Sequence, residues 1–166
     1  MKKGWTTVYL SLGANRGNRA RQIEQALGLL GVAGVRVRRR SSLYETAPVG
    51  MRSRQWFLNC VVEARTRFAP LALLRLAKRI ESALGRRAAR GRRPADRPID
   101  IDIVYYGKSV LRRPGLSSPH PRRAERRFVL EPLRELAPRW RDPVTRHTVA
   151  EMLEETEDRS AVRRLR

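Results

Sequence analysis

The chain has 166 residues and a formal net charge of +21, from 37 Lys and Arg against 16 Asp and Glu. A hydrophobic fraction of 41% is typical of a globular domain, and no apolar run reaches the ~20 residues of a membrane-spanning helix. The single cysteine, Cys60, excludes an internal disulfide and a cysteine-based zinc site. We therefore expect a cytoplasmic protein, monomeric, whose basic surface attracts phosphate groups.

Apolar residues recur with strand and helix periodicity along most of the chain. Strands are expected at Thr6–Leu12, Val35–Thr46, Trp56–Thr66 and Ile99–Tyr106. Helices are expected at 19–31, 70–84, Phe128–Leu136 and Val149–Glu155, with Asn18 as an N-cap and Pro70 in a first turn. The order strand–helix–strand–strand–helix–strand predicts an α+β fold, a ferredoxin-like βαββαβ sandwich with extra C-terminal helices.

Two carboxylates stand out in the last of these strands. Asp100 and Asp102 are two positions apart, so both side chains should lie on the same strand face. Asp is depleted in strands and like charges repel, which predicts a cation against this pair. Two hard oxygen ligands suit Mg²⁺. The alternative is a solvated strand face that happens to carry two Asp residues.

A basic segment leads into the two-Asp strand. Its six arginines are Arg86, Arg87, Arg90, Arg92, Arg93 and Arg97. A cationic loop beside a metal-binding carboxylate pair is what phosphoryl transfer needs, because that chemistry depends on positioning and on neutralising the charge of phosphate oxygens. A solvated basic loop is the alternative interpretation.

Other residues could bind a flat heterocycle or phosphates. Phe57 and Asn59 share a strand face, so a stacking ring would lie beside an amide able to read hydrogen-bond donors and acceptors. A core Phe and a turn-side Asn are the alternative. His120 and Arg126, in or near a Pro-rich loop, could both reach phosphates, whereas a surface His is the default expectation.

Short motifs that occur in order along the chain together resemble one enzyme family. They are Leu10–Asn15, Ser42–Gly50, Phe57–Asn59, Arg79–Glu81, Gly85–Arg86, Arg97–Ile103 and Pro119–His120. Over residues 7–155 the chain resembles 6-hydroxymethyl-7,8-dihydropterin pyrophosphokinase of folate synthesis. The combination of R-x-I-D-I-D-I with an upstream F-L-N carries most of the specificity, and the resemblance also implies a ferredoxin-like topology.

The resemblance implies transfer of pyrophosphate from ATP, the co-substrate, to the hydroxymethyl group of the dihydropterin, giving the pterin diphosphate and AMP. It implies that Asp100 and Asp102 hold two Mg²⁺ ions and that Arg86 and Arg97 act in catalysis with them. The implied pterin contacts are Thr46, Ala47, Pro48, Val49, Gly50, Phe57, Asn59 and Phe128. The implied ATP contacts are Lys78, Glu81, Ile103, Ser117, His120 and Arg126. We expect a single catalytic domain over residues 1–156 and a flexible C-terminal tail over residues 157–166.

The sequence departs from the family pattern at a few positions. Lys78 stands where Gln is common, Pro121 follows the loop His where Tyr is common, and the basic loop is about one residue longer than usual, so the alignment of residues 87–93 stays open. These departures concern the ATP side of the site more than the two carboxylates.

The charge of +21 favours a second interpretation, a ferredoxin-like RNA-binding module. Such a module exposes aromatic residues in a set pattern on its central strands. Tyr9, Phe57, Tyr105 and Tyr106 do not follow that pattern, and paired Asp residues on a central strand would repel RNA. We therefore expect ATP and the dihydropterin as small-molecule partners, and neither a membrane nor a nucleic acid.

Overall fold

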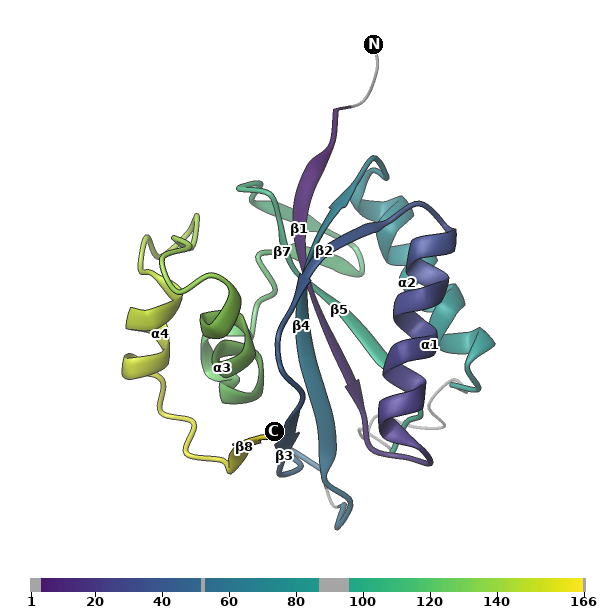
Figure 1. The fold of residues 1–166 in the computed structure, drawn as a ribbon. Helices are drawn as coiled ribbons and strands as arrows, with labels where there is room; N and C mark the ends of the chain where they lie inside the picture. The colour runs from purple at the N-terminus through teal and green to yellow at the C-terminus, as the bar shows by residue number, and fades with distance from the viewer. Residues whose placement is uncertain (1–3, 52, 87–95, 166) are drawn as a thin grey trace.

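The computed structural model describes residues 4–51, 53–86 and 96–165, in which a mixed α and β fold places an antiparallel sheet between two pairs of helices (Figure 1). The sheet has the strand order β5-β1-β4-β3-β8, and β2 also pairs with β4. Its strands are β1 (Thr6–Ala14), β2 (Arg36–Arg40), β3 (Tyr44–Thr46), β4 (Phe57–Thr66), β5 (Asp100–Tyr106) and β8 (Val162–Arg164). A separate hairpin is formed by β6 (Leu111–Arg113) and β7 (Leu116–Ser118).

The helices are α1 (Arg19–Val32), α2 (Pro70–Ala83), α3 (Arg127–Leu136) and α4 (Val149–Glu155), and a 3-10 turn spans Arg123–Glu125. The predicted helices are all confirmed. Asn18 caps α1 by accepting a hydrogen bond from the Arg21 amide, and Pro70 occupies the first turn of α2. In the part of the chain that the structure describes, no helix is both long enough and apolar enough to cross a membrane.

The larger core lies between the sheet and the helices α1 and α2. Alternate residues of the central strands point to it, including Leu10 and Leu12, Cys60 and Val62, and Ile101 and Ile103. They meet buried side chains of α1 and α2 such as Ile23, Leu30, Leu73 and Ile80. Each fully buried Leu or Ile stabilises the fold by about 1.5–3 kcal/mol, so this alternation fixes which face of each strand is buried.

The opposite face of the sheet is covered over only part of its length. Tyr9, Val61 and Tyr105 pack against α3 and α4 in a second core. Further along the same strands the residues become small or polar, with Gly13 paired to both Asp100 and Asn59. The helices therefore leave one end of this face to polar side chains, and the candidate site lies there.

The strand expected over Val35–Thr46 is divided into β2 and β3, which both pair with β4. Ser41 separates them: its amide donates to the Val61 carbonyl and its hydroxyl accepts from the Val61 amide at 3.0 Å. The Ser41 side chain thus replaces a backbone acceptor in the ladder, and pairing resumes at Tyr44 with a shifted register.

The segment expected to be a flexible tail contains β8, which pairs antiparallel with β3. The Leu165 amide also donates to the Leu43 carbonyl at 2.8 Å. Two of the three residues of β8 are arginines. The sequence therefore has no apolar alternation there that would predict a strand. β3 would otherwise be the outer strand of the sheet, and such an edge favours pairing with another chain segment.

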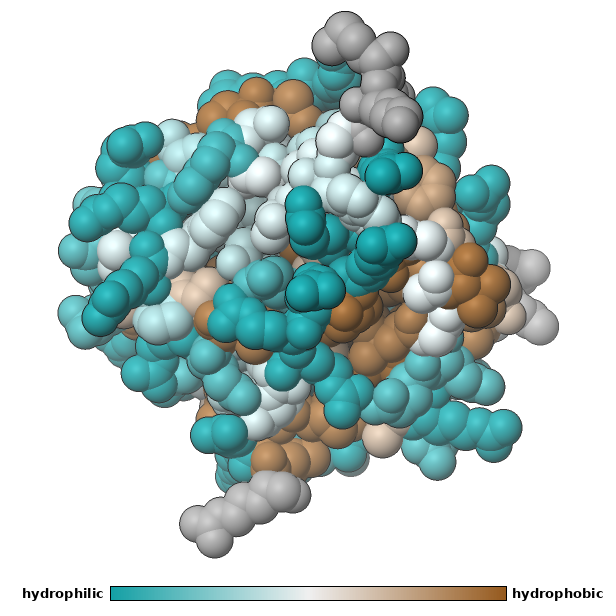
Figure 2. All heavy atoms as spheres, turned by 45° about the horizontal axis from the view of Figure 1, so that its top comes forward, coloured by the Kyte–Doolittle hydropathy of each residue, from teal (hydrophilic) through white to brown (hydrophobic). Residues whose placement is uncertain are grey.

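Hydrophilic side chains spread over most of the face in Figure 2, with brown apolar residues confined to limited areas between them. This distribution agrees with the high charge of the chain. It also agrees with the position of the two cores, which lie between the sheet and the helices on either face.

A buried carboxylate joins the 3-10 turn to the sheet. Asp142, fully buried, accepts hydrogen bonds from two guanidinium nitrogens of Arg123, from the Tyr105 hydroxyl at 2.8 Å and from the amides of Val144 and Thr145. Burial alone would raise the pKa of Asp142, but these hydrogen bonds outweigh it and lower that pKa. The stabilisation is therefore present above the ordinary pKa of 3.8 and is lost as the pH falls below it.

We predict that Asp142→Ala lowers the free energy of unfolding by about 3–5 kcal/mol, because it leaves the Arg123 guanidinium buried without its partner. Urea denaturation followed by circular dichroism measures the change. Glu154→Ala is the control, since Glu154 is exposed on α4, and its effect should stay within about 0.5 kcal/mol. An Asp142→Ala protein as stable as the wild type would contradict this account.

Candidate functional site

Two carboxylates of β5 form the centre of the site. Asp100 and Asp102 lie on the face away from Ile101 and Ile103, which are buried against α1 and α2. The carboxylates meet three guanidinium groups: Arg86 binds Asp100, Arg97 lies 3.3 Å from Asp100, and Arg126 lies 3.6 Å from Asp102. The two Asp side chains thus share one strand face, as the alternation of the strand predicts, and Arg126 joins Arg86 and Arg97 from the residue before α3.

The two carboxylates differ in their affinity for a proton. Burial opposes ionisation of Asp100, but the charges of Arg97 and Arg86 outweigh it and lower the pKa of Asp100. Burial and the nearby Asp100 charge instead raise the pKa of Asp102 to about 6. An additional cation beside Asp102 would favour its ionised form.

The donor set fits a hard divalent cation. Mg²⁺ in proteins is commonly held by one or two carboxylates together with phosphate oxygens and water. Asp100 and Asp102 supply two such carboxylates on one strand face. Among the residues that the structure describes, no group of three or more His, Cys, Asp or Glu side chains forms a closed metal site. Phosphate or water would have to complete the coordination.

Glu81, a residue of α2, contacts both β5 and Arg86 next to the carboxylate centre. Its side chain is only 2% exposed, and it accepts hydrogen bonds from the Ile101 amide at 2.7 Å and from Lys78 at 3.1 Å. Arg86 lies 2.7 Å from the other Glu81 oxygen and also binds Asp100. Glu81 thereby connects α2 to β5 and fixes the Arg86 guanidinium against Asp100.

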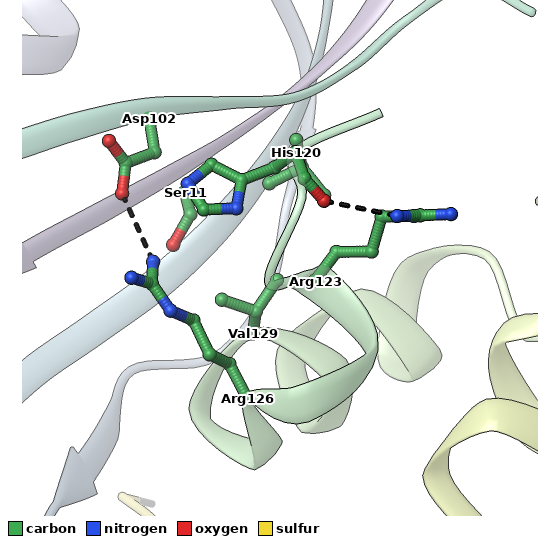
Figure 3. A pocket seen from close by; sticks show the side chains of 7 residues that line it. Ser11, Asp102, His120, Arg123, Arg126 and Val129 are labelled. Atoms are coloured by element: carbon green, nitrogen blue, oxygen red, sulfur yellow. Dashed lines mark hydrogen bonds and ion pairs between the residues drawn. The ribbon is translucent and has the colours of Figure 1, made fainter. Parts of the chain in front are cut away.

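A small hollow lies beside Asp102 and is lined by Ser11, Asp102, Val104, His120, Arg123, Arg126 and Val129 (Figure 3). In this view Asp102, the His120 ring and the Arg126 guanidinium surround the hollow, whereas the Arg123 guanidinium points away from it. The sequence predicted His120 and Arg126. Ser11, which β1 places opposite Asp102, was not among the predicted site residues, although it lies within the Leu10–Asn15 motif.

Asn59 and Thr46 form a buried polar pair next to the carboxylates. The Asn59 side-chain nitrogen donates to the Thr46 hydroxyl at 2.6 Å. Gly13 lies between Asn59 and Asp100 in the sheet, and a Cβ on Gly13 would come within 2.3 Å of the Asn59 side-chain oxygen. Any larger residue at position 13 would therefore have to displace the Asn59 side chain.

Two aromatic rings carry guanidinium groups on their faces. Arg97 lies over the Phe57 ring at 5.6 Å, and Arg126 lies over the Phe128 ring at 5.5 Å, measured to the ring centroids. These are also the arginines that contact Asp100 and Asp102. The carboxylate centre and the two aromatic rings therefore form one connected site.

A model of the 7,8-dihydro-6-hydroxymethylpterin-pyrophosphokinase (HPPK) family matches residues 9–138. The chain belongs to the HPPK family. A Bacillus subtilis relative, 2-amino-4-hydroxy-6-hydroxymethyldihydropteridine pyrophosphokinase, is 43% identical over 130 residues, which cover 78% of this chain and 77% of that protein. The family resemblance inferred from the motifs is thereby confirmed.

Some HPPK relatives are much longer than this chain. The mitochondrial folate synthesis bifunctional protein of Pisum sativum is 43% identical over 129 residues, but the match covers 78% of this chain and only 25% of that protein. The chain thus spans about a quarter of that relative. A crystal structure of Plasmodium falciparum HPPK-DHPS with SDX-DHP matches with a TM-score of 0.74 at 15% identity, covering 92% of this chain and 44% of that one. That likeness concerns the fold alone.

The structure describes several further residues that the family resemblance assigns to substrate binding. Ala47 and Pro48 are half-buried, Val49 and Gly50 are exposed, and Gly50 has a φ of 70° that favours glycine. Ile103 lies in the larger core, and Ser117 is half-buried in β7. Arg87, Arg90, Arg92 and Arg93 of the basic loop lie outside the described residues.

The imidazole of His120 is neutral at ordinary pH. Burial, with the Arg126 and Arg122 charges, lowers the pKa of His120 to about 4. The Nδ1 atom accepts a hydrogen bond from the Arg122 amide at 3.1 Å, which requires this nitrogen to be unprotonated. Because the pKa is lowered, the stability that neutral His120 contributes is present above the ordinary pKa of 6.5 and is lost as the pH falls toward 4.

We predict that the His120 ring signal in NMR spectra shows no titration between pH 5.5 and 8, with a midpoint at about 4. The chain has only two histidines, so the His147→Gln variant leaves His120 as the single ring to observe. Removing one positive charge with Arg126→Gln should raise the midpoint. A midpoint near 6.5 in the wild type would contradict the burial of His120 beside these arginines.

Proposed function

We propose that this protein transfers pyrophosphate from ATP to the hydroxymethyl group of 6-hydroxymethyl-7,8-dihydropterin, giving the pterin diphosphate and AMP in folate synthesis. The observation that carries the proposal is one connected site. It joins a carboxylate pair and three arginines to a buried Asn59–Thr46 pair, within a chain of the HPPK family. The name and coverage of the Bacillus subtilis relative support the same activity.

The dihydropterin would bind over β4 and the loop that follows β3. Asn59 and Thr46 offer an amide and a hydroxyl to the edge of the heterocycle, with the backbone of residues 46–50 beside them. Phe57 and Phe128 would stack on its two faces, where Arg97 and Arg126 now lie. Guanidinium groups are flat and stack on aromatic rings, so their positions mark surfaces that also suit a flat heterocycle.

The ATP phosphates would bind at the carboxylate centre. Asp100 and Asp102 would hold two Mg²⁺ ions, which when bound would neutralise phosphate oxygens. Arg86 and Arg97 would contact the group being transferred, and Arg126 would exchange Asp102 for a phosphate oxygen. His120, held neutral, could donate one hydrogen bond to ATP without adding charge.

The reaction itself needs positioning more than covalent chemistry by the protein. The hydroxymethyl oxygen attacks the β-phosphorus of ATP while the bond from that phosphorus to the α,β-bridging oxygen breaks. The electron pair leaves with AMP, and the hydroxyl proton passes to solvent. Arg86 and Arg97 stabilise negative charge on the transferring oxygens, and Asn59 keeps the acceptor in line with them.

We also propose that the chain folds as a ferredoxin-like βαββαβ sandwich and forms one catalytic domain. The strand order β5-β1-β4, flanked by β2 and β3, supports a ferredoxin-like sandwich in which α1 and α2 cover one face. Residues 1–156 would form a single catalytic domain, to which β8 adds an outer strand. Lys78 and Glu81 would act through Arg86, because both lie in its ion-pair network.

The proposal is tested by incubating the purified protein with ATP, Mg²⁺ and 6-hydroxymethyl-7,8-dihydropterin and separating the nucleotides. AMP and pterin diphosphate should form in equal amounts, and no AMP should form without the pterin. ADP as the product would indicate transfer of a single phosphoryl group and would contradict the proposal. RNA filter binding in parallel tests the alternative of a nucleic-acid-binding module.

We predict that Asp102→Asn lowers kcat by about a thousandfold, because a metal ligand worth several kcal/mol in the transition state is lost. Its free energy of unfolding should stay equal or rise, since burial and the Asp100 charge together outweigh the attraction of Arg126 for the ionised Asp102, so that its pKa is raised. AMP release and thermal denaturation measure the two effects. Glu125→Gln, an exposed carboxylate, is the matched control and should turn over like the wild type. Near wild-type turnover of Asp102→Asn would refute the metal assignment.

We predict that Gly13→Ala weakens pterin binding by about 1–3 kcal/mol, because the new methyl group displaces the buried Asn59 amide. ATP binding should change little. Calorimetry with each ligand measures both affinities. Gly28→Ala is the control, since a Cβ at this position of α1 meets nothing within 4 Å. Equal losses for the two ligands would show that Gly13 and Asn59 do not form a separate pterin pocket.

A further inference from the structure

The C-terminal residues 158–165, called here the clasp, lie beyond the part of the chain that the family model matches. They run from the start of α3 to the edge of the sheet, where β8 pairs with β3 (Figure 1). The clasp therefore touches both elements that would enclose the pterin: the helix that begins next to Phe128 and the strand that ends at Thr46.

At one end the clasp holds the first turn of α3. Asp158 accepts a hydrogen bond from the Arg127 amide at 2.8 Å, and its other oxygen accepts from the Ser160 amide at 2.8 Å. Arg126, which precedes α3, provides no side-chain cap. Asp158 thus performs the N-cap function from a distant part of the chain, and its negative charge is favourable at a helix N-terminus.

At the other end the clasp holds the strand and loop that carry Thr46. Thr46 pairs with Val162, and the Ala47 amide donates to the Ala161 carbonyl at 3.0 Å. Arg163 lies over the Trp56 ring at 4.8 Å, one residue before Phe57. Thr46, which the clasp holds by this pairing, also accepts a hydrogen bond from Asn59 through its side-chain hydroxyl.

The opposite end of α3 is already tied to the sheet without Asp158. Glu135 accepts a hydrogen bond from the Tyr44 hydroxyl at 2.7 Å and from the Ser42 amide at 3.0 Å. Arg164 of the clasp lies 3.5 Å from Glu135. The clasp and Glu135 therefore hold the two ends of α3, and the end near Phe128 is the one held by Asp158.

We propose that the clasp sets the separation between Phe128 and the Thr46–Asn59 pair, with Asp158 as a positioning residue for the pterin. The proposal rests on the proposed function of the same site. Because Asp158 contacts backbone rather than substrate, it acts through the placement of α3. Small displacements of a binding wall reduce affinity for a rigid, flat ligand more than for a flexible one.

The test compares Asp158→Ala in the full chain with the wild type by calorimetry, first with a non-hydrolysable ATP analogue and then with the pterin in its presence. We expect the pterin Kd to rise about tenfold, comparable to the loss of a strong helix cap. The Kd of the ATP analogue should rise less than the pterin Kd. Of the groups that would bind its phosphates, only Arg126 lies next to the residue that Asp158 holds, whereas Asp100, Asp102 and Arg86 have no contact with the clasp among the described residues. At saturating pterin, kcat should recover.

Two further variants complete the experiment. Glu157→Ala is the matched control: Glu157 is exposed beside Asp158 and forms no hydrogen bond or ion pair in the described part of the chain, so its pterin Kd should equal that of the wild type. Asp158→Asn keeps the shape of the side chain and one acceptor oxygen. Its pterin Kd should lie between those of the wild type and Asp158→Ala. It also decides the question if Asp158→Ala does not fold.

An unchanged pterin Kd in folded Asp158→Ala or Asp158→Asn overturns the clasp proposal, as does an equal loss of affinity for both ligands. These outcomes differ from a failure of the proposed function, in which the wild-type protein itself would form no AMP and bind no pterin.

Discussion

The pairing of β1 with both β4 and β5 is the constraint on which the site depends. Through it, Gly13 stands between Asp100 on one side and Asn59 on the other. Three positions far apart in the chain thereby form one row across the sheet, with no side chain at its centre. The alternation that buries Leu12 and Ile101 against α1 and α2 turns this row to the opposite face. The hydrophobic core and the polar site are thus two results of a single strand register.

The helices α3 and α4 decide where on that face the site opens. They pack on Tyr9, Val61 and Tyr105 and stop before Asp100 and Asn59. Arg126 and Phe128 stand at the first turn of α3, so the helix that closes the second core also forms a wall of the site. The start of α3 therefore contributes both to the second core and to the candidate site. The Asp142–Arg123 pair fixes the turn before this end, and Asp158 fixes its first residue.

The parts of this structure that sequence could predict are those governed by local spacing. Asp100 and Asp102 share a face because strand side chains alternate, and Asn18 caps α1 because an N-cap acts within three residues. The contact of Gly13 with Asn59 and the support of Arg86 by Glu81 follow from pairing between distant segments, which no periodicity reveals. The interruption between β2 and β3 at Ser41 and the strand β8 were missed for a related reason. At Ser41 a side chain replaces a backbone acceptor, and β8 is stabilised by the existing edge of β3.

The positive charge of the chain is balanced by carboxylates in the site. Guanidinium groups that cluster without counter-ions repel each other, and burying them unpaired is costly. Here Asp100, Asp102 and Glu81 neutralise Arg97, Arg126 and Arg86 while the arginines stay in place. In the proposed reaction, an arriving polyphosphate with its cations would replace one set of ion pairs by another: the arginines would turn to phosphate oxygens and the carboxylates to metal. Exchanging partners costs less than removing water from free charges, because the groups are already partly dehydrated and oriented. The ion pairs of the free protein therefore prepare its residues for the ligand charges that the proposed reaction requires.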